Sequence, residues 1–368
     1  MSDSKKDKFL PRKKRSVKKI LAFIAFIALN AIVIIITARS EFGNSSNATE
    51  LSEVKINWWL FIPATVCFLV AIVLDIYRYV LMIKSMPEYN SLNKKEFREK
   101  SGTVWKVARR TVLLGKYYDS VTPAAIGGQP FQIYYMRKNS GLSRGESVSI
   151  PLVGMIANQI GFLVIAIICL IFSSVSYKNP ALTVTAWFGL LFFAFWPVMV
   201  AGVSFFPDAT TRFLKWLVKV FFKLKIIKNR DKALSVIEKE IKGYAQSVKM
   251  ILKKRGLFLK VVIMSIIFNT LIMSIPFFVL TAFGGNVDPL ECFALSVAVT
   301  SAVYFIPTPG NSGAAEGTFF LVFSALSSGY VFWAMLFWRF YSYYIYIIIG
   351  PFVYLSMQLE KKRMERNA

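Results

Sequence analysis

Six long apolar segments constrain this chain more than any other feature of its sequence. A helix needs about 20 apolar residues to cross the hydrocarbon core of a bilayer. The six segments cover residues 20–37, 58–83, 147–175, 181–206, 257–283 and 330–357. With 55% hydrophobic residues and 33 phenylalanines, the chain has far more apolar material than a soluble core of this size requires. The sequence predicts an all-α polytopic membrane protein with about six full spans.

Two further apolar stretches are interrupted. Residues 111–136 contain two charged residues, two prolines and a Gly-Gly pair, and residues 306–317 read I-P-T-P-G-N-S-G-A-A-E-G. In lipid, a broken helix is tolerated only inside protein or beside a water-filled cavity, because its freed backbone amides need partners. We expect two re-entrant broken hairpins that enter from opposite faces. The alternatives are an interfacial amphipathic segment for the first stretch and a plain interhelix loop for the second.

The basic residues predict how the chain is threaded. The net charge is +25, and the largest basic blocks are the tail 1–19 and the loop 207–256, which has fourteen basic residues against four acidic ones. If both hairpins return to their own side, every large basic block falls on one face, which the positive-inside rule assigns to the cytoplasm. The organisation expected is a cytoplasmic tail 1–19, a transmembrane domain 20–357 and a cytoplasmic tail 358–368.

Charge pattern and residue types also restrict the partners. The basic blocks alternate with apolar spans, which indicates anionic membrane headgroups rather than nucleic acid. In the loop 207–256, apolar residues are interleaved with lysines, as in an amphipathic helix on an anionic leaflet; a solvated loop is the alternative. There is no histidine, and the three cysteines stand at unrelated spacings, so we expect no cofactor, metal site or disulfide framework.

Few ionisable residues fall at or near membrane depth. They are Asp75, Arg78, Lys116, Asp119, Glu316 and Arg339. Because a charge in the membrane is tolerated when it is paired or hydrated, these groups predict a compensated polar interior. Helix N-termini together with Arg78, Lys116 and Arg339 would attract a phosphate. Alternatively, Asp75–Arg78 and Lys116–Asp119, each three residues apart, are ordinary interfacial ion pairs.

Taken together, the interrupted motifs resemble a known family. T-P-A-A-I-G-G-Q-P-F-Q-I-Y-Y-M (122–136), P-T-P-G-N-S-G-A-A-E-G (307–317) and Arg339 in the last span resemble the lysylphosphatidylglycerol synthase transmembrane family. That family includes the flippase domain of the bacterial multiple peptide resistance factor. The resemblance covers about residues 15–360. It implies a multi-pass protein of the bacterial plasma membrane that moves phospholipid, such as aminoacylated phosphatidylglycerol, between leaflets, with a part in lipid metabolism and antibiotic resistance.

The resemblance also points to individual residues. The substrate-path candidates from the two motifs are Gly127, Gly128, Gln129, Pro309, Gly310, Gly313 and Glu316. Gln129 stands where the family has a glutamate, and Asn311-Ser312 replaces the family's Gly-Leu. The chain ends soon after the last span, so we expect a stand-alone flippase-like protein without the aminoacyl-transferring domain of the full synthases.

The leading hypothesis is a lipid translocase, not an enzyme, with Glu316 and Arg339 as the principal pair of its polar path. No P-loop motif is visible in the sequence, so transport would be passive or coupled to ions or protons through Glu316 or Asp119. One alternative is an intramembrane lipid transferase with Glu316 or Asp119 as general base. Another is an accessory subunit that binds anionic lipid, or a lipid-modifying partner enzyme, through residues 207–256.

Overall fold

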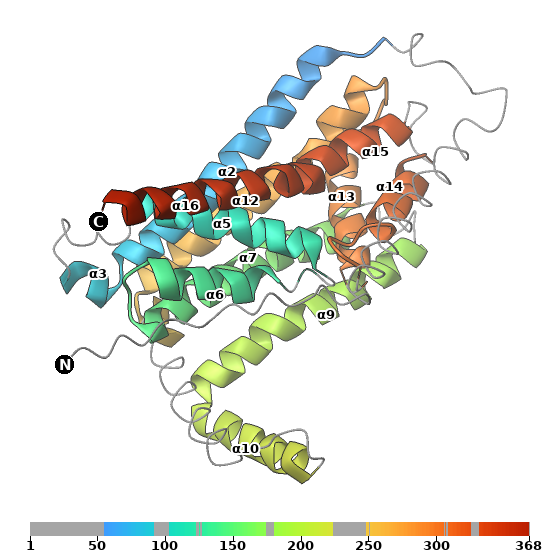
Figure 1. Ribbon diagram of the computed structural model, residues 1–368. Helices are drawn as coiled ribbons and strands as arrows, with labels where there is room; N and C mark the ends of the chain where they lie inside the picture. Colours follow the sequence, from blue (N-terminus) through green and yellow to red (C-terminus); the bar gives the residue numbers. More distant parts are fainter. Residues whose placement is uncertain are drawn as a thin grey trace, which may run out of the picture. The chain divides into compact units, whose positions relative to one another are not determined.

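The structure is a computed structural model, and every regular element that it describes is a helix (Figure 1). It describes residues 55–91, 103–122, 125, 127–173, 180–223, 248–249, 251–304, 306, 308–324 and 331–367. The predicted all-α polytopic architecture is confirmed. The predicted basic tail 1–19 and first span 20–37 lie outside the described residues.

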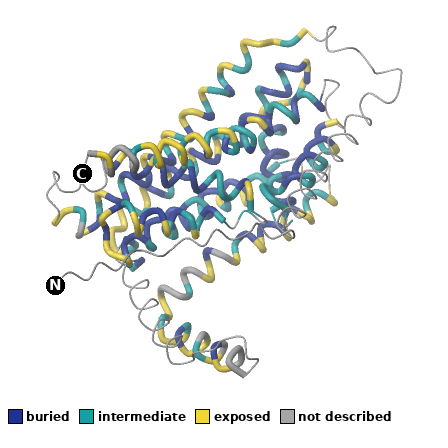
Figure 2. The backbone as a smooth tube through the Cα atoms, viewed as in Figure 1, coloured by how far each residue is buried: buried dark blue, intermediate teal, exposed yellow. Residues whose placement is uncertain are grey.

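Within the described ranges, five helical stretches are long and apolar enough to cross a membrane. They are Trp58–Lys84, which consists of a 3₁₀ turn and α2 (Phe61–Lys84); α7 (Arg144–Phe172); Pro180–Met199 within α9 (Pro180–Phe205); α12 (Arg255–Ala282); and Val331–Glu360. Figure 2 shows exposed residues along α2 and α9, and buried residues where helices meet. Large apolar side chains such as Phe172, Phe188 and Leu191 are exposed, as expected of a surface that faces lipid.

The last span contains a π-helical turn. It begins as α15 (Val331–Arg339), passes through the π turn Phe340–Tyr344 and continues as α16 (Ile345–Asn367). A π turn interrupts the regular hydrogen-bond ladder of a helix and often occurs at functional sites. The turn contacts α2, since the hydroxyls of Tyr341 and Thr65 are 2.8 Å apart.

The first interrupted stretch folds as a helical hairpin. Its arms are α5 (Val104–Val121) and α6 (Gly128–Asn139), which pack against each other. α5 begins at Val104, seven residues before the interrupted stretch. Its N-cap is Thr103, whose hydroxyl accepts a hydrogen bond from the amide of Lys106. The hairpin is therefore confirmed, and its entry from one membrane face stays a prediction.

The second interrupted stretch breaks as expected. α13 (Pro289–Val303) and α14 (Ala314–Ser324) lie on either side of it. The turn between them contains left-handed residues: Gly310 has φ +57°, Asn311 +55° and Gly313 +86°. Glycine and asparagine tolerate this conformation better than other residues, which explains why the motif holds them at these positions.

Helix contacts define how the bundle is packed. α2 packs against α12 and α5, α7 against α9 and α12, and α13 against α9. Small residues allow the closest approaches. A Cβ atom on Gly189 of α9 would lie 1.8 Å from the carbonyl oxygen of Ser301 in α13. On Gly161 of α7, it would lie 2.9 Å from the backbone of α12.

Two further helices, α3 (Pro87–Ser91) and α10 (Pro207–Lys223), are not among the five candidate spans. The short α3 follows α2, and α10 follows α9. α10 begins the predicted basic loop 207–256 and is helical as expected, while residues 224–247 lie outside the described part. Phe213 and Trp216 of α10 are each 57% exposed, beside the exposed cations Arg212 and Lys219.

The last helix is also tied to the first hairpin. Glu360 of α16 binds Lys106 at 2.8 Å and Arg110 at 2.9 Å, both on α5. Further along, a Cβ atom on Gly350 of α16 would meet the ring of Tyr117 on α5 at 2.3 Å. α5 therefore lies directly against the last helix along much of its length.

Candidate functional site

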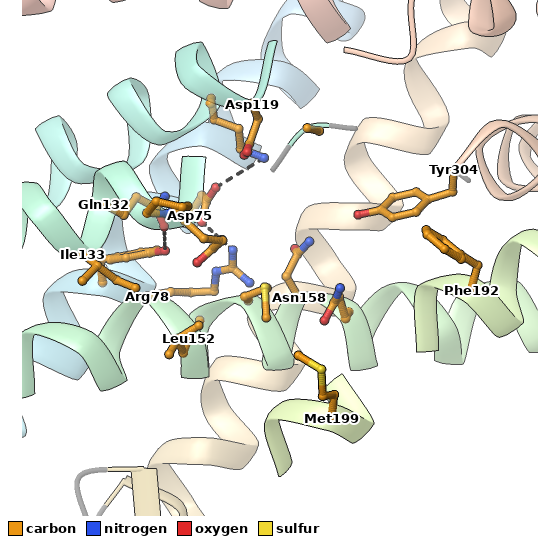
Figure 3. A pocket seen from close by; sticks show the side chains of 18 residues that line it. Asp75, Arg78, Asp119, Gln132, Ile133, Leu152, Asn158, Phe192, Met199 and Tyr304 are labelled. Carbon is orange, nitrogen blue, oxygen red and sulfur yellow. Dashed lines mark hydrogen bonds and ion pairs between the residues drawn. The ribbon is translucent and has the colours of Figure 1, made fainter. Parts of the chain in front are cut away.

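Five helices line a cavity of about 490 Å³ (Figure 3). They are α2, α5, α6, α7 and α9, and the residue that ends α13 joins them. The polar part of the wall consists of Asp75, Arg78, Tyr79, Lys116, Asp119, Gln129, Gln132, Asn158, Gln159 and Tyr304. The apolar part includes Ile133, Leu152, Met155, Phe192 and Met199. The cavity therefore combines charged groups, amides and apolar surface between three helices of membrane length (α2, α7 and α9) and the shorter α5 and α6.

Asp75 and Arg78 form the ion pair that their spacing on α2 predicts. The other terminal nitrogen of Arg78 donates to the hydroxyl of Ser265 on α12, so both terminal nitrogens have protein acceptors. Both residues are buried. A buried pair of this kind is held in place by its neighbours, and removing one partner would leave the other charge uncompensated.

Lys116 approaches the same carboxylate from the hairpin. Its Nζ lies 3.8 Å from Asp75 Oδ2 and 4.8 Å from the centre of the Phe268 ring. The lysine side chain is 31% exposed, in contrast to Arg78. Lys116 thus pairs across helices with Asp75 rather than with Asp119, the partner considered from sequence.

Asp119 binds the start of the second arm of the hairpin. Its Oδ1 accepts a hydrogen bond of 2.8 Å from the amide of Gly128, at the first position of α6. A helix N-terminus favours such a carboxylate. Any Cβ atom on Gly128 would lie 2.3 Å from this carboxylate, and one on Gly127 would lie 2.5 Å from Thr122. The Gly-Gly pair is therefore required by the close return of the chain.

The glutamines of α6 face the cavity beside these charges. Gln132 Oε1 accepts a hydrogen bond of 3.0 Å from the hydroxyl of Tyr79, and Gly115 leaves room for its amide. Gln129 Oε1 is buried and has no hydrogen-bond partner among the described residues. A neutral amide here offers both an acceptor and donors to a bound group.

Sequence reasoning missed five polar residues of the cavity: Tyr79, Gln132, Asn158, Gln159 and Tyr304. Figure 3 labels Gln132, Asn158 and Tyr304 among them. Asn158 Oδ1 accepts from Asn269 of α12 at 3.3 Å. Gln159 Oε1 is buried without a hydrogen-bond partner in the described part of the chain. The adjacent side-chain amides of Asn158 and Gln159, in the middle of an apolar span, could have indicated this site. Polar groups at that depth are costly, so they are expected where they bind a partner or a substrate.

Glu316 and Arg339 form a second polar cluster. Glu316 Oε1 accepts from Arg339 Nε at 2.7 Å, and Oε2 accepts from the amide of Gly313 at 2.7 Å. Arg339 also donates to Ser312 Oγ at 3.1 Å and to the carbonyl of Gly310 at 3.3 Å. The relative exposure is 1% for Glu316 and 4% for Arg339. This pair fastens the turn between α13 and α14 to the last span.

The turn of the second interruption touches the first hairpin. A Cβ atom on Gly310 would lie 2.2 Å from the Tyr343 ring and 3.3 Å from the carbonyl oxygen of Ser120, in the last turn of α5. The carbonyl of Pro309 accepts from the amide of Ser312 within the same turn. The two interruptions therefore lie close to each other in the structure.

The twelve candidate residues thus divide between two places. Five of them, Asp75, Arg78, Lys116, Asp119 and Gln129, line the cavity, and Gly127 and Gly128 shape the turn beside it. Pro309, Gly310, Gly313, Glu316 and Arg339 belong to the second cluster and are not part of the cavity wall. The expectation of one interior that holds all six ionisable groups is not met, because Glu316 and Arg339 compensate each other in a separate buried site.

These features define a multi-pass α-helical membrane protein with a charged cavity beside a broken helical hairpin. The chain belongs to the family described as the lysylphosphatidylglycerol synthase TM region, whose sequence profile matches residues 20–350. Family membership makes it a membrane protein related to lipid-headgroup flippases. A comparison with curated proteins found no match, and neither did one with solved structures.

Proposed function

We propose that this protein translocates a phospholipid between membrane leaflets, and that the headgroup passes through the cavity beside the α5–α6 hairpin. The single observation that carries the proposal is the cavity wall. Its four charged side chains and four amides lie on the α5–α6 hairpin and on the span helices α2 and α7. Ionisable groups at membrane depth are costly, so they are expected where a polar substrate needs them. The family relation to lipid-headgroup flippases supports the same function.

The chemistry of the wall suits an amphipathic substrate. Lys116 can donate to a phosphate, and the buried acceptors Gln129 Oε1 and Gln159 Oε1 can receive donors of a headgroup. Leu152 and Met199 supply apolar surface for the glycerol and the start of the acyl chains. A path of this composition would lower the cost of moving a headgroup past the hydrocarbon core.

The proposal includes the setting inferred from the sequence. It places the protein in the bacterial plasma membrane with both termini in the cytoplasm, where the basic blocks meet anionic headgroups. Transport is passive or coupled to ions or protons through Asp119. The protein acts as a transporter rather than an enzyme. Of the two carboxylates considered as general base, Glu316 is bound by Arg339 and by the Gly313 amide, and Asp119 accepts from the Gly128 amide.

A second candidate function rests on α10. Exposed Phe213 and Trp216 stand beside exposed Arg212 and Lys219, a composition that suits an anionic membrane surface. An accessory subunit that recruits a lipid-modifying enzyme would use this surface and would not need the cavity. Leaflet transfer of phospholipid, measured with the purified protein alone, distinguishes the two functions.

The test is leaflet transfer of acyl-labelled fluorescent phospholipids in proteoliposomes. Leu152→Trp places a bulky ring in the cavity wall and is expected to slow transfer by about tenfold or more, equivalent to about 1.4 kcal/mol on the barrier. Ile168→Trp is the matched control, because Ile168 is exposed on the same helix α7 and does not line the cavity. Equal transfer by both variants would remove the cavity from the path, and no transfer by folded wild-type protein would favour the accessory function.

A further inference from the structure

The charges of the cavity wall balance, although the chain as a whole is strongly basic. The net charge of the chain is +25. In the cavity, however, two carboxylates (Asp75 and Asp119) face two cations (Arg78 and Lys116), and the other described residues of the wall are neutral. Arg339, which sequence reasoning counted toward phosphate binding, lies outside this wall and is bound by Glu316. The cavity therefore has no excess of positive charge to attract an anion.

Two of the four charges are already committed to the protein. Arg78 directs one terminal nitrogen to Asp75 and the other to Ser265. Asp75 in turn is shared between Arg78 and Lys116. Arg78 Nε has no hydrogen-bond partner among the described residues, but the two charges of this buried pair compensate each other, so the pair offers a ligand little net charge.

The other two charges keep capacity for a ligand. Lys116 is 31% exposed, has three N–H donors and makes one long ion pair of 3.8 Å. Asp119 uses Oδ1 to accept from the Gly128 amide, and no described residue donates to its Oδ2. The two residues are three apart on α5, so their side chains leave the same face of the helix with Cβ atoms about 5–6 Å apart. The hairpin thus presents one cation and one anion side by side to the cavity.

From this arrangement we infer that the substrate is a zwitterionic phospholipid of zero net charge whose headgroup bears a primary ammonium. This inference rests on the proposed translocation and specifies its substrate class. Lys116 binds the phosphate and Asp119 binds the ammonium, which sits within a short link of the phosphate in such headgroups. The buried Oε1 atoms of Gln129 and Gln159 supply further acceptors for ammonium N–H groups.

The same geometry disfavours other headgroups. An anionic phosphatidylglycerol headgroup would leave Asp119 facing it without a partner, and a cationic headgroup would add an unmatched positive charge. Each leaves an uncompensated charge between the helices of the bundle, which is costly. A phosphocholine headgroup is neutral overall, but its quaternary ammonium has no N–H to donate to Asp119 or to the glutamine oxygens.

The experiment measures headgroup preference by binding, so that it does not depend on transport. The purified full chain in detergent is given equal amounts of phosphatidylethanolamine, phosphatidylglycerol, phosphatidylcholine and lysyl-phosphatidylglycerol with identical acyl chains, and the bound lipids are counted by native mass spectrometry. We expect phosphatidylethanolamine to exceed each other lipid by about tenfold or more, which corresponds to the lower end of the range for one charge-assisted hydrogen bond.

Charge variants make the test specific to the cavity. Asp119→Asn gives the wall one net positive charge and is expected to shift the preference toward phosphatidylglycerol. Lys116→Gln gives one net negative charge and should shift it toward lysyl-phosphatidylglycerol. Matched controls are Asp208→Asn on α10 and Lys138→Gln on α6, which make the same charge changes at exposed positions outside the cavity. The controls should keep the preference of the wild type.

The possible outcomes separate this inference from the proposed function. A wild-type preference for phosphatidylglycerol or lysyl-phosphatidylglycerol, equal binding of all four lipids, or a preference unchanged by both cavity variants would each overturn the substrate class. Leaflet transfer without headgroup preference would contradict only this inference. Selective binding of phosphatidylethanolamine without any leaflet transfer would contradict only translocation.

Discussion

Replacing Arg339 with alanine is expected to lower the free energy of unfolding by about 3–5 kcal/mol, because it leaves a buried carboxylate without its counter-charge. Glu316 is almost completely buried and accepts directly from Arg339 Nε. The same substitution removes the donors to Ser312 Oγ and to the carbonyl of Gly310. The turn between α13 and α14 would therefore lose its fastening to the last span.

The measurement is unfolding of the purified protein in mixed micelles with increasing SDS, followed by tryptophan fluorescence. Lys138→Ala is the control. Lys138 is exposed, so its replacement removes a cation without creating a buried unpaired charge. The double variant Glu316→Gln, Arg339→Met should recover a large part of the loss, since an apolar replacement of a buried ion pair is often nearly neutral. Wild-type stability of Arg339→Ala would show that Glu316 has another counter-charge or is not buried.

Gly189→Ala is expected to destabilise the protein by about 2–3 kcal/mol, at the upper end of the usual cost of overpacking. The reason is backbone contact: the added Cβ would lie 1.8 Å from the carbonyl oxygen of Ser301, so α9 and α13 must separate. Flexible side chains could relieve such a clash, but a helix backbone cannot do so locally.

Gly202→Ala on the same helix provides the matched comparison. In the described part of the chain, no atom lies within 4 Å of a Cβ at Gly202, so the substitution adds helix propensity of up to about 1 kcal/mol without a clash. The two variants are compared by the same SDS unfolding and by the yield of monodisperse protein. If Gly189→Ala is as stable as Gly202→Ala, the close α9–α13 contact is wrong.

The spans could be predicted well because apolar length alone determines them. The predicted segments 58–83 and 257–283 agree within two residues with Trp58–Lys84 and Arg255–Ala282. Their helix ends are less predictable from apolarity, as α7 shows. It starts at Arg144 rather than near residue 147, because Ser143 and Glu146 form a capping box that extends the helix through polar residues. Apolar residues mark where lipid contact begins, not where the helix begins.

The candidate site could be predicted only where local spacing decides the contact. The Asp75–Arg78 pair follows from two residues three apart on one helix. In contrast, the approach of Lys116 to Asp75 depends on how α5 lies against α2. The separation of Glu316 from the cavity is likewise a tertiary result. Motifs identified that carboxylate as important, but no sequence pattern distinguishes a group that lines a path from one that holds a turn in place.

The π turn at Phe340–Tyr344 has a mechanical consequence. Arg339 of the last span binds Glu316 beside the α13–α14 turn, and Glu360 near the other end of the span binds two cations of α5. Both interrupted elements are thereby bound to the same helix, the last span. A displacement of one element relative to the other must break one of these contacts or bend the last span. Helices bend where their hydrogen-bond ladder is already interrupted. The π turn lies between these two contacts, so it is where we expect the last span to bend.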